Sequence, residues 1–109
     1  MKNGIILAVV MTVLTARMGV NTFNGHKETW YNLNMNKVVS NADEAGLCGW
    51  YWEREDGCKM YGPFIIVAAN QEKHPYGSIV ETSLGLGIVL DTGDFAKEND
   101  EQYDIAVTW

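Results

Sequence analysis

The sequence predicts a mainly β fold, in which about six short strands curl into a small barrel, with one short helix on the N-terminal side. Three observations predict it. The 109 residues include 11 glycines and 2 prolines, which favours short strands joined by turns over long helices. Hydrophobic residues make up 47% of the chain, enough for the folded core of one domain. Strands this short expose their edges in an open sheet, and closure into a barrel hides them.

The N-terminal segment, residues 1–19, is set apart by its composition. Its apolar stretch from Ile5 to Ala16 follows a lysine and, at about 12 residues, is too short to cross a bilayer comfortably. We therefore expect a signal peptide or an N-terminal anchor, and a protein that is secreted or associated with the cell wall. Membrane contact is expected through this segment alone, and a buried strand is the alternative interpretation. Residues 20–29 are polar and aperiodic, which predicts a linker before the folded domain of residues 30–109.

The folded domain is expected to begin with a strand around Trp30 and Tyr31 and to continue with a helix over residues 34–45. Asn34 can accept a hydrogen bond from an amide of the first turn, and Gly46 can end the helix in a left-handed turn. The apolar residues at helical spacing are Met35, Val38, Val39, Ala42 and Ala45. Further strands, bounded by turn residues, are expected at residues 49–53, 60–69, 77–82, 86–90 and 105–109.

The net charge of the chain excludes one class of partner. Acidic residues number 14 against 8 basic ones, which gives a formal charge of −6 and a pI of about 4.7. Proteins that bind nucleic acid collect phosphates on a basic surface. We therefore expect no nucleic-acid partner.

The cysteines and histidines favour a disulfide bond over a metal centre. Cys48 and Cys58 lack the CxxC spacing and the nearby histidine pair of a zinc site, so we expect no metal ion. In an exported domain of this size a Cys48–Cys58 disulfide is the favoured interpretation, and two buried free thiols are the alternative. His26 lies in the expected linker and His74 in the loop QEKHPYG, where we expect solvated side chains.

Two aspartates near the C-terminus form the strongest catalytic signal. The segment from Asp91 to Asp104 carries six acidic residues and one lysine, and the stretch KENDEQ within it is typical of a solvated loop. Asp91 instead ends the apolar run LGIVL, and Asp104 lies inside YDIAV, so both are expected at the rim of a β core. A carboxyl beside apolar neighbours and a second carboxylate has a raised pKa, as a general acid requires. The alternative is that each aspartate caps a turn by accepting from backbone amides.

Two families share motifs with this chain. The stretch IVLDTG is similar to the catalytic strand of retroviral-type aspartic proteases, but Asp94 replaces their small residue and only 16 residues follow Gly93. A wider resemblance covers residues 60–109. There GPFIIVAAN, HPYGSIVETSLGLGIVLDTGDFA and YDIAVTW resemble, in this order, the motifs of the Asp-Asp-Asp ("3D") domain family. That resemblance implies a small six-stranded double-psi β-barrel, related to the catalytic barrel of membrane-bound lytic transglycosylase A and found in exported cell-wall proteins of Gram-positive bacteria and their phages.

The resemblance also implies a set of site residues. Asp91 and Asp104 match the second and third family aspartates, Thr92 and Gly93 match the residues after the second, and Asn70 replaces the first. Asp104 would be the catalytic acid and Asp91 its supporting neighbour, with Asn70, Thr92 and Gly93 contacting the sugar. The implied reaction cleaves peptidoglycan glycan strands without water and leaves 1,6-anhydromuramyl ends. We expect a monomer that needs no cofactor.

A second function stays open beside this one. A non-catalytic barrel could bind glycan or another wall component through Trp30, Trp50, Trp52 and Tyr76, because aromatic rings stack on sugars. The alternative for the tryptophans is core packing, since Trp50 and Trp52 lie on one face of an expected strand.

Overall fold

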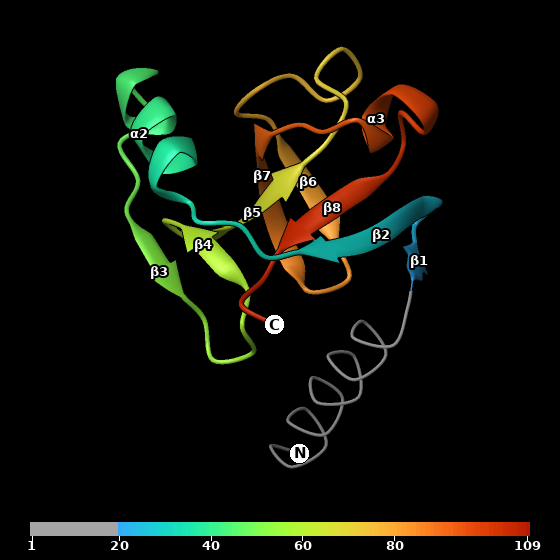
Figure 1. Ribbon diagram of the computed structural model, residues 1–109, viewed down its shortest axis with the longest axis horizontal. Helices are drawn as coiled ribbons and strands as arrows, with labels where there is room; N and C mark the ends of the chain where they lie inside the picture. The colour runs from blue at the N-terminus through green and yellow to red at the C-terminus, as the bar shows by residue number, and fades with distance from the viewer. Residues whose placement is uncertain (1–19) are drawn as a thin grey trace.

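Eight strands and two helices make up residues 20–109, the part of the chain that the computed structural model describes (Figure 1). The mainly β prediction is therefore confirmed, whereas the expected leader at residues 1–19 lies outside the described residues. Neither helix of the described part has the length and apolar composition that a membrane crossing requires. The elements are β1 (Asn21–Phe23), β2 (His26–Tyr31), α2 (Asn36–Glu44), β3 (Tyr51–Glu53), β4 (Lys59–Tyr61), β5 (Phe64–Ala68), β6 (Ile79–Thr82), β7 (Gly85–Asp91), α3 (Phe95–Glu98) and β8 (Tyr103–Ala106).

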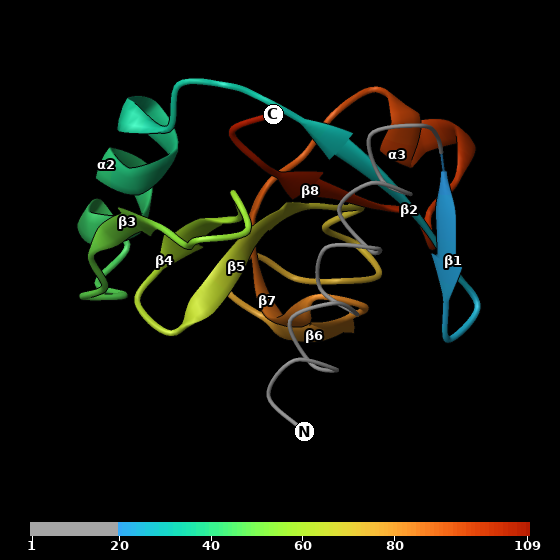
Figure 2. The same cartoon turned by 90° about the horizontal axis from the view of Figure 1, so that it is seen from below.

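The strands form one sheet in the order β1-β2-β8-β5-β4-β3, and β7 joins it by pairing with both β5 and β6. β2 runs parallel to β8, β5 runs parallel to β7, and β5 runs antiparallel to β8. In Figures 1 and 2 these four strands form the centre of the molecule, with α2 and β3 to one side and β1 and α3 to the other. The expected count of six strands is wrong, because the edge strand β1 and the division of residues 60–69 into β4 and β5 add two. Backbone pairing also leaves the sheet open at β1, β3 and β6 in the described residues.

The expected linker at residues 20–29 is a β-hairpin instead. Phe23 pairs with His26, and the two residues between them, Asn24 and Gly25, both have positive φ, at 51° and 81°. Asn-Gly is the preferred dipeptide of this two-residue hairpin turn, because both positions tolerate a left-handed backbone. The short and polar strand β1 concealed this signal in the sequence.

The helix predicted at residues 34–45 is confirmed as α2. The Asn34 side chain accepts a hydrogen bond from the Asn36 amide at 2.9 Å, and Gly46 has a φ of +86° just after the helix. A second helix, α3, was not expected: Phe95 and Ala96 anchor one turn in the acidic segment, where Ala96 is buried.

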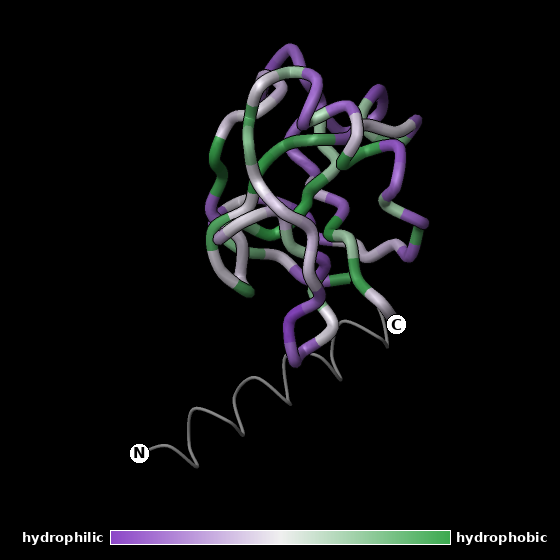
Figure 3. Tube along the Cα trace, turned by 90° about the vertical axis from the view of Figure 1, so that its left-hand side faces the viewer, coloured by the Kyte–Doolittle hydropathy of each residue, from purple (hydrophilic) through white to green (hydrophobic). Residues whose placement is uncertain are grey.

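Apolar side chains form two clusters, one on each face of the central strands. One contains Met60, Ile65, Val67, Val89 and Ile105, and Trp30 and Trp109 pack against it. The other contains Ile66, Ile88, Leu90 and Ala106 together with Met35, Val38 and Ala42 from α2 and its first turn. Figure 3 shows hydrophobic stretches that run through the middle of the folded part and hydrophilic ones in the loops around it. The alternation of side chains along the central strands thus directs successive apolar residues to one cluster and then the other.

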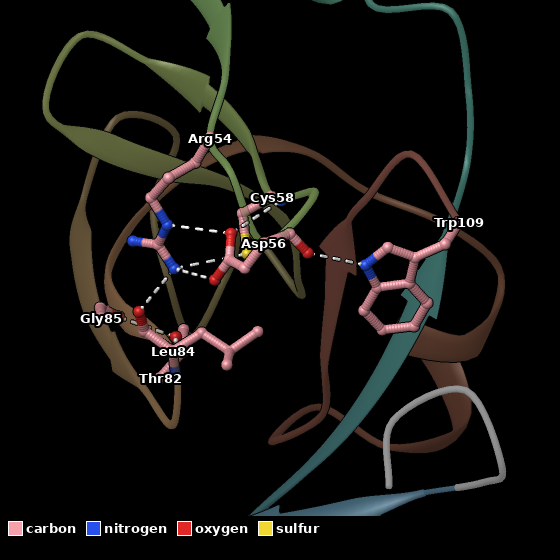
Figure 4. A network of polar contacts seen from close by, with 7 residues as sticks. All are labelled: Arg54, Asp56, Cys58, Thr82, Leu84, Gly85 and Trp109. Carbon is pink, nitrogen blue, oxygen red and sulfur yellow. Dashed lines mark hydrogen bonds and ion pairs between the residues drawn. The ribbon is translucent and has the colours of Figure 1, made fainter. Parts of the chain in front are cut away.

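A polar network fixes the turn between β3 and β4 (Figure 4). The Arg54 guanidinium donates to both carboxylate oxygens of Asp56, at 3.0 and 2.7 Å, and Arg54 Nη2 also donates to the Leu84 carbonyl at 2.8 Å. Trp109 Nε1 donates to the Asp56 carbonyl at 2.9 Å, which attaches the C-terminus to the same turn. Burial alone would raise the pKa of Asp56, but hydrogen bonds from Arg54 and the Cys58 amide lower it below its usual value.

The predicted disulfide is absent, since Cys48 and Cys58 are both free thiols. Cys58 is buried within the network, 3.5 Å from Arg54 Nη2, whereas Cys48 is exposed after α2. Burial and the nearby Asp56 carboxylate raise the pKa of Cys58 to about 12, so this thiol stays protonated at neutral pH. Its place in the network keeps Cys58 in the core and away from Cys48.

Candidate active site

Asp91 and Asp104 lie on the two sides of one residue of the central sheet. Ala68, the last residue of β5, pairs with Asp104 of β8 on one side and with Asp91 of β7 on the other. Ala68 itself is buried between the two aspartates. The carboxylate pair expected from the sequence therefore comes together, although 12 residues separate its members in the chain.

A β-bulge turns Asp91 to the face on which Asp104 lies. Val67 pairs with Val89, but the next residue, Ala68, pairs with Asp91, so β7 contains one extra residue at Leu90. Without the bulge, Asp91 would share the face of Val89, which packs into the other cluster. β-Bulges are common beside active sites because they re-aim a side chain in this way.

Asp104 is a partly buried carboxyl with one side-chain hydrogen bond. Thr29 Oγ1 donates to Asp104 Oδ1 at 3.0 Å, and Gln102 Nε2 donates to the same Thr29 oxygen at 2.9 Å. Burial raises the pKa of Asp104; the Thr29 hydrogen bond acts against this, and the Asp91 charge adds to it, with a net shift upwards. A carboxyl of this kind holds its proton to a higher pH than an exposed aspartate does.

Asp91 accepts two hydrogen bonds, one on each oxygen. Tyr31 Oη donates to Oδ2 at 3.0 Å, and the Thr92 amide donates to Oδ1 at 2.9 Å. Burial, followed by the charge and hydrogen bond of Asp91, raises the pKa of Tyr31 far above its usual value, so the phenol remains a donor. Hydrogen-bond donors thus hold both oxygens of Asp91, whereas Asp104 is the carboxyl of the pair whose pKa is raised.

The other three expected site residues, Asn70, Thr92 and Gly93, line a hollow of about 500 Å³ together with residues of α3, and neither Asp91 nor Asp104 is part of its lining. The Asn70 side chain donates to the Ala96 carbonyl at 3.1 Å and accepts from two amides of its own turn. It therefore shapes the turn that follows β5. A Cβ at Gly93 would lie 3.2 Å from the Phe95 ring, which gives this glycine a packing reason as well.

The aromatic residues of β3 (Tyr51, Trp52) and Trp50 just before it are exposed, which contradicts the alternative interpretation that these tryptophans pack in the core. Trp50 has 62% of its surface accessible, Trp52 has 39% and Tyr51 has 36%. A groove of about 600 Å³ between α2 and β3 lies beside them, lined by Tyr51, Glu53 and Lys59 among others. Trp30, in contrast, packs against the core.

Thr29, Tyr31 and Gln102 were not identified from the sequence. Thr29 and Tyr31 reach the aspartates because β2 pairs in parallel with β8, where Thr29 is opposite Asp104. Parallel pairing between β2 and the last strand, β8, has no local sequence signature. The alternation Thr29-Trp30-Tyr31, once assigned to a strand, does place the two hydroxyls on one face.

Comparison with protein-family models, with curated proteins and with solved structures gives no match for this chain. What the site can do is therefore argued from its own chemistry. A carboxyl with a raised pKa next to a second carboxylate can donate a proton and later accept one, as general acid-base catalysis requires.

Proposed function

We propose that the protein is a lytic transglycosylase-like enzyme of the cell wall, with a double-psi β-barrel similar to the 3D domain, that cleaves peptidoglycan glycan strands. One observation carries the proposal: Asp91 and Asp104 flank Ala68, and the pKa of Asp104 is raised. The three motifs of the sequence resemblance also meet here, because β5, β7 and β8 are neighbouring strands. The proposed place of action is outside the cytoplasm.

In the proposed reaction Asp104 serves both half-steps. Protonated Asp104 donates its proton to the glycosidic oxygen as the bond from that oxygen to C1 of the muramyl ring breaks and positive charge grows on the ring. The resulting Asp104 carboxylate then accepts the proton of the C6 hydroxyl, and O6 bonds to C1 to close a 1,6-anhydro ring. Neither water nor a cofactor enters the balance.

The neighbours of Asp104 have supporting roles in this scheme. The Asp91 carboxylate lies across Ala68, where its charge raises the pKa of Asp104 and stabilises positive charge on the ring. Thr29 holds one Asp104 oxygen and leaves the other to meet the glycosidic bond. Tyr31 of β2 reaches Asp91 of β7 across β8 and β5, on the face where Asp104 lies, and fixes one of its oxygens.

The test is the product of the reaction. Purified full-length chain is incubated with peptidoglycan, and mass spectrometry of the soluble fragments is expected to show 1,6-anhydromuropeptides. Asp104→Asn is expected to lower their rate of formation by about 10²–10⁴-fold, the usual contribution of a general acid. Asp100→Asn, which changes an exposed acid of the same segment, is the matched control and should retain activity. Products with reducing muramic acid ends, or anhydro products that persist in Asp104→Asn, would contradict the mechanism.

A second candidate is a glycan-binding module, which the exposed aromatic residues of β3 favour. Trp50, just before β3, and Trp52 within it are both exposed, and Trp52 Nε1 donates to the Gly62 carbonyl at 2.7 Å, which fixes its ring. Trp50→Ala is then expected to weaken co-sedimentation with peptidoglycan, whereas Leu86→Ala, an exposed apolar control on β7, should not. Binding that depends on Trp50, together with no anhydro product, would favour the module over the enzyme.

A further inference from the structure

Three potential metal ligands from distant parts of the chain meet at one end of β2 and β8. His26 is the first residue of β2, His74 lies in the turn after β5, and Glu101 lies shortly before β8. One ligand atom from each lies within 4.8 Å of the other two. The chain has two histidines in all, and both belong to this cluster.

His26 is held in the orientation that metal-binding histidines usually have. Its Nδ1 lies 2.6 Å from the Glu101 backbone carbonyl oxygen, which can only accept, so Nδ1 carries the proton. In the neutral imidazole the lone pair is therefore on Nε2, which lies 3.4 Å from Tyr103 Oη. Histidine ligands commonly donate their other ring N–H to a backbone carbonyl in this way, which fixes the tautomer. The ring also stacks on Tyr103, with centroids 4.3 Å apart and planes 14° from parallel.

His74 presents a buried nitrogen that lacks a hydrogen bond. Its Nε2 is shielded from solvent and has no hydrogen-bonding partner in the described residues, although Glu101 Oε1 lies 3.3 Å away. A tetrahedral zinc ion with ligands at about 2.0–2.1 Å separates neighbouring ligand atoms by about 3.3 Å. The spacing of His74 and Glu101 thus matches two ligands of one ion. The Tyr103 ring makes an edge contact with His74, with centroids 5.1 Å apart, and so packs against both imidazoles.

We propose that His26, His74 and Glu101 bind a divalent transition-metal ion, with Zn²⁺ as the class that best suits two imidazoles and a carboxylate. The Glu101 side chain is half exposed, which leaves a fourth position open to water. The ion would tie the turn after β5 to the ends of β2 and β8. The site is independent of the proposed glycan chemistry, because His26 and Thr29 lie on opposite faces of β2. The sequence predicted no metal site, since the ligands are far apart along the chain.

Metal binding by the full-length chain tests the site. After treatment with EDTA and dialysis, titration calorimetry with Zn²⁺ is expected to show one ion per chain. His74→Ala and Glu101→Gln each remove a ligand that lies outside the strands. Each should weaken Zn²⁺ binding by at least about 10-fold, because even the loss of a residue that only supports a ligand usually lowers metal affinity by that much. Glu98→Gln, a nearby exposed acid, and Cys48→Ser, the exposed thiol, are controls that should bind as the parent chain does.

Two further measurements keep the result clear. Zn²⁺ should raise the melting temperature of the parent chain and not that of His74→Ala, because an ion that binds the folded state stabilises it. Co²⁺ should give the visible absorption of a tetrahedral site in the parent chain only. Circular dichroism checks that each variant is folded. If His74→Ala does not fold, the result for Glu101→Gln decides whether the site binds the ion. Three results would overturn the proposal: no stoichiometric Zn²⁺ binding, unchanged binding in Glu101→Gln, or loss of binding in Cys48→Ser. If the parent chain bound no ion, the cluster would be a His74–Glu101 ion pair only.

Discussion

Two acidic sites of this protein, Asp56 and the pair Asp91 and Asp104, differ in how their negative charge is compensated. Asp56 has a counterion: Arg54 binds both of its oxygens, the Cys58 amide adds a third hydrogen bond, and its pKa is lowered (Figure 4). Asp91 and Asp104 face each other instead. Within residues 20–109 neither forms an ion pair with a lysine, arginine or histidine, and the pKa of Asp104 is raised.

The contrast separates a structural carboxylate from a candidate catalytic one. A paired carboxylate lowers the free energy of the folded state and has little tendency to accept a proton. A carboxyl that is buried beside a second carboxylate costs stability when it ionises, and it exchanges its proton nearer to neutral pH. Sites that combine perturbed pKa values with a strand bulge are where we expect chemistry.

The largest expected effect on stability is at the paired carboxylate. Asp56→Asn removes the charge that Arg54 binds and should lower the free energy of unfolding by about 1.5–3 kcal/mol, the range for hydrogen bonds to charged groups. Asp94→Asn, at a fully exposed acid, should change it by less than about 0.5 kcal/mol. Urea denaturation near neutral pH measures both values. Equal effects would show that the Arg54 network contributes nothing to the fold.

A smaller effect is expected from Tyr31→Phe, which removes the phenol donor to Asp91. The free energy of unfolding should fall by about 1 kcal/mol, because the partly buried Asp91 carboxylate loses a hydrogen bond. Tyr51→Phe is the matched control: its hydroxyl donates to Glu53 at 2.7 Å on the exposed strand β3, where water can replace it. A Tyr51→Phe effect as large as that of Tyr31→Phe would contradict a special environment at Asp91.

The smallest expected effect has the opposite sign. Because the pKa of Asp104 is raised on folding, the folded state holds this proton to higher pH than the unfolded chain does. Stability contributed by Asp104 is therefore complete below the unfolded pKa, about 3.9, and is lost as pH rises through the folded pKa. Asp104→Asn should be slightly more stable than the parent chain near neutral pH, and the gain should vanish in acid.

The pH dependence at Asp56 should run the other way. Its folded pKa is lowered, so its stabilisation is present above the unfolded pKa and is lost as pH falls through the folded pKa. The penalty of Asp56→Asn should therefore shrink in acid. If the stability changes caused by Asp56→Asn and Asp104→Asn varied with pH in the same direction, the distinction between the two acidic sites would be lost.

Local sequence signals predicted the elements that local physics determines. Helix α2 follows from apolar spacing with Asn34 and Gly46 at its ends, and five strands follow from apolar runs between turns. The Asn24-Gly25 hairpin was missed because β1 has no apolar alternation to accompany its turn. The open sheet of eight strands depends on which edges find partners, and no local pattern determines that.

The acidic pair was predictable in part. Asp91 and Asp104 stand out because each interrupts an apolar run, and that signal survives in the fold as partial burial. Their hydroxyl partners, Thr29 and Tyr31, depend on the parallel pairing of β2 with the last strand, β8. The free state of Cys48 and Cys58 could not be predicted from spacing, since a disulfide needs both sulfurs to meet.

The most direct test measures the carboxyl groups themselves. A carbon-13 NMR titration of the aspartate side chains in the full-length chain gives a midpoint for each carboxyl. Asp104 is expected to titrate above the ordinary value of about 3.9 and Asp56 below it, and Asp91→Asn should lower the Asp104 midpoint. An Asp104 midpoint at or below the ordinary value, or one that Asp91→Asn does not lower, would contradict the assignment of this pair as a catalytic site.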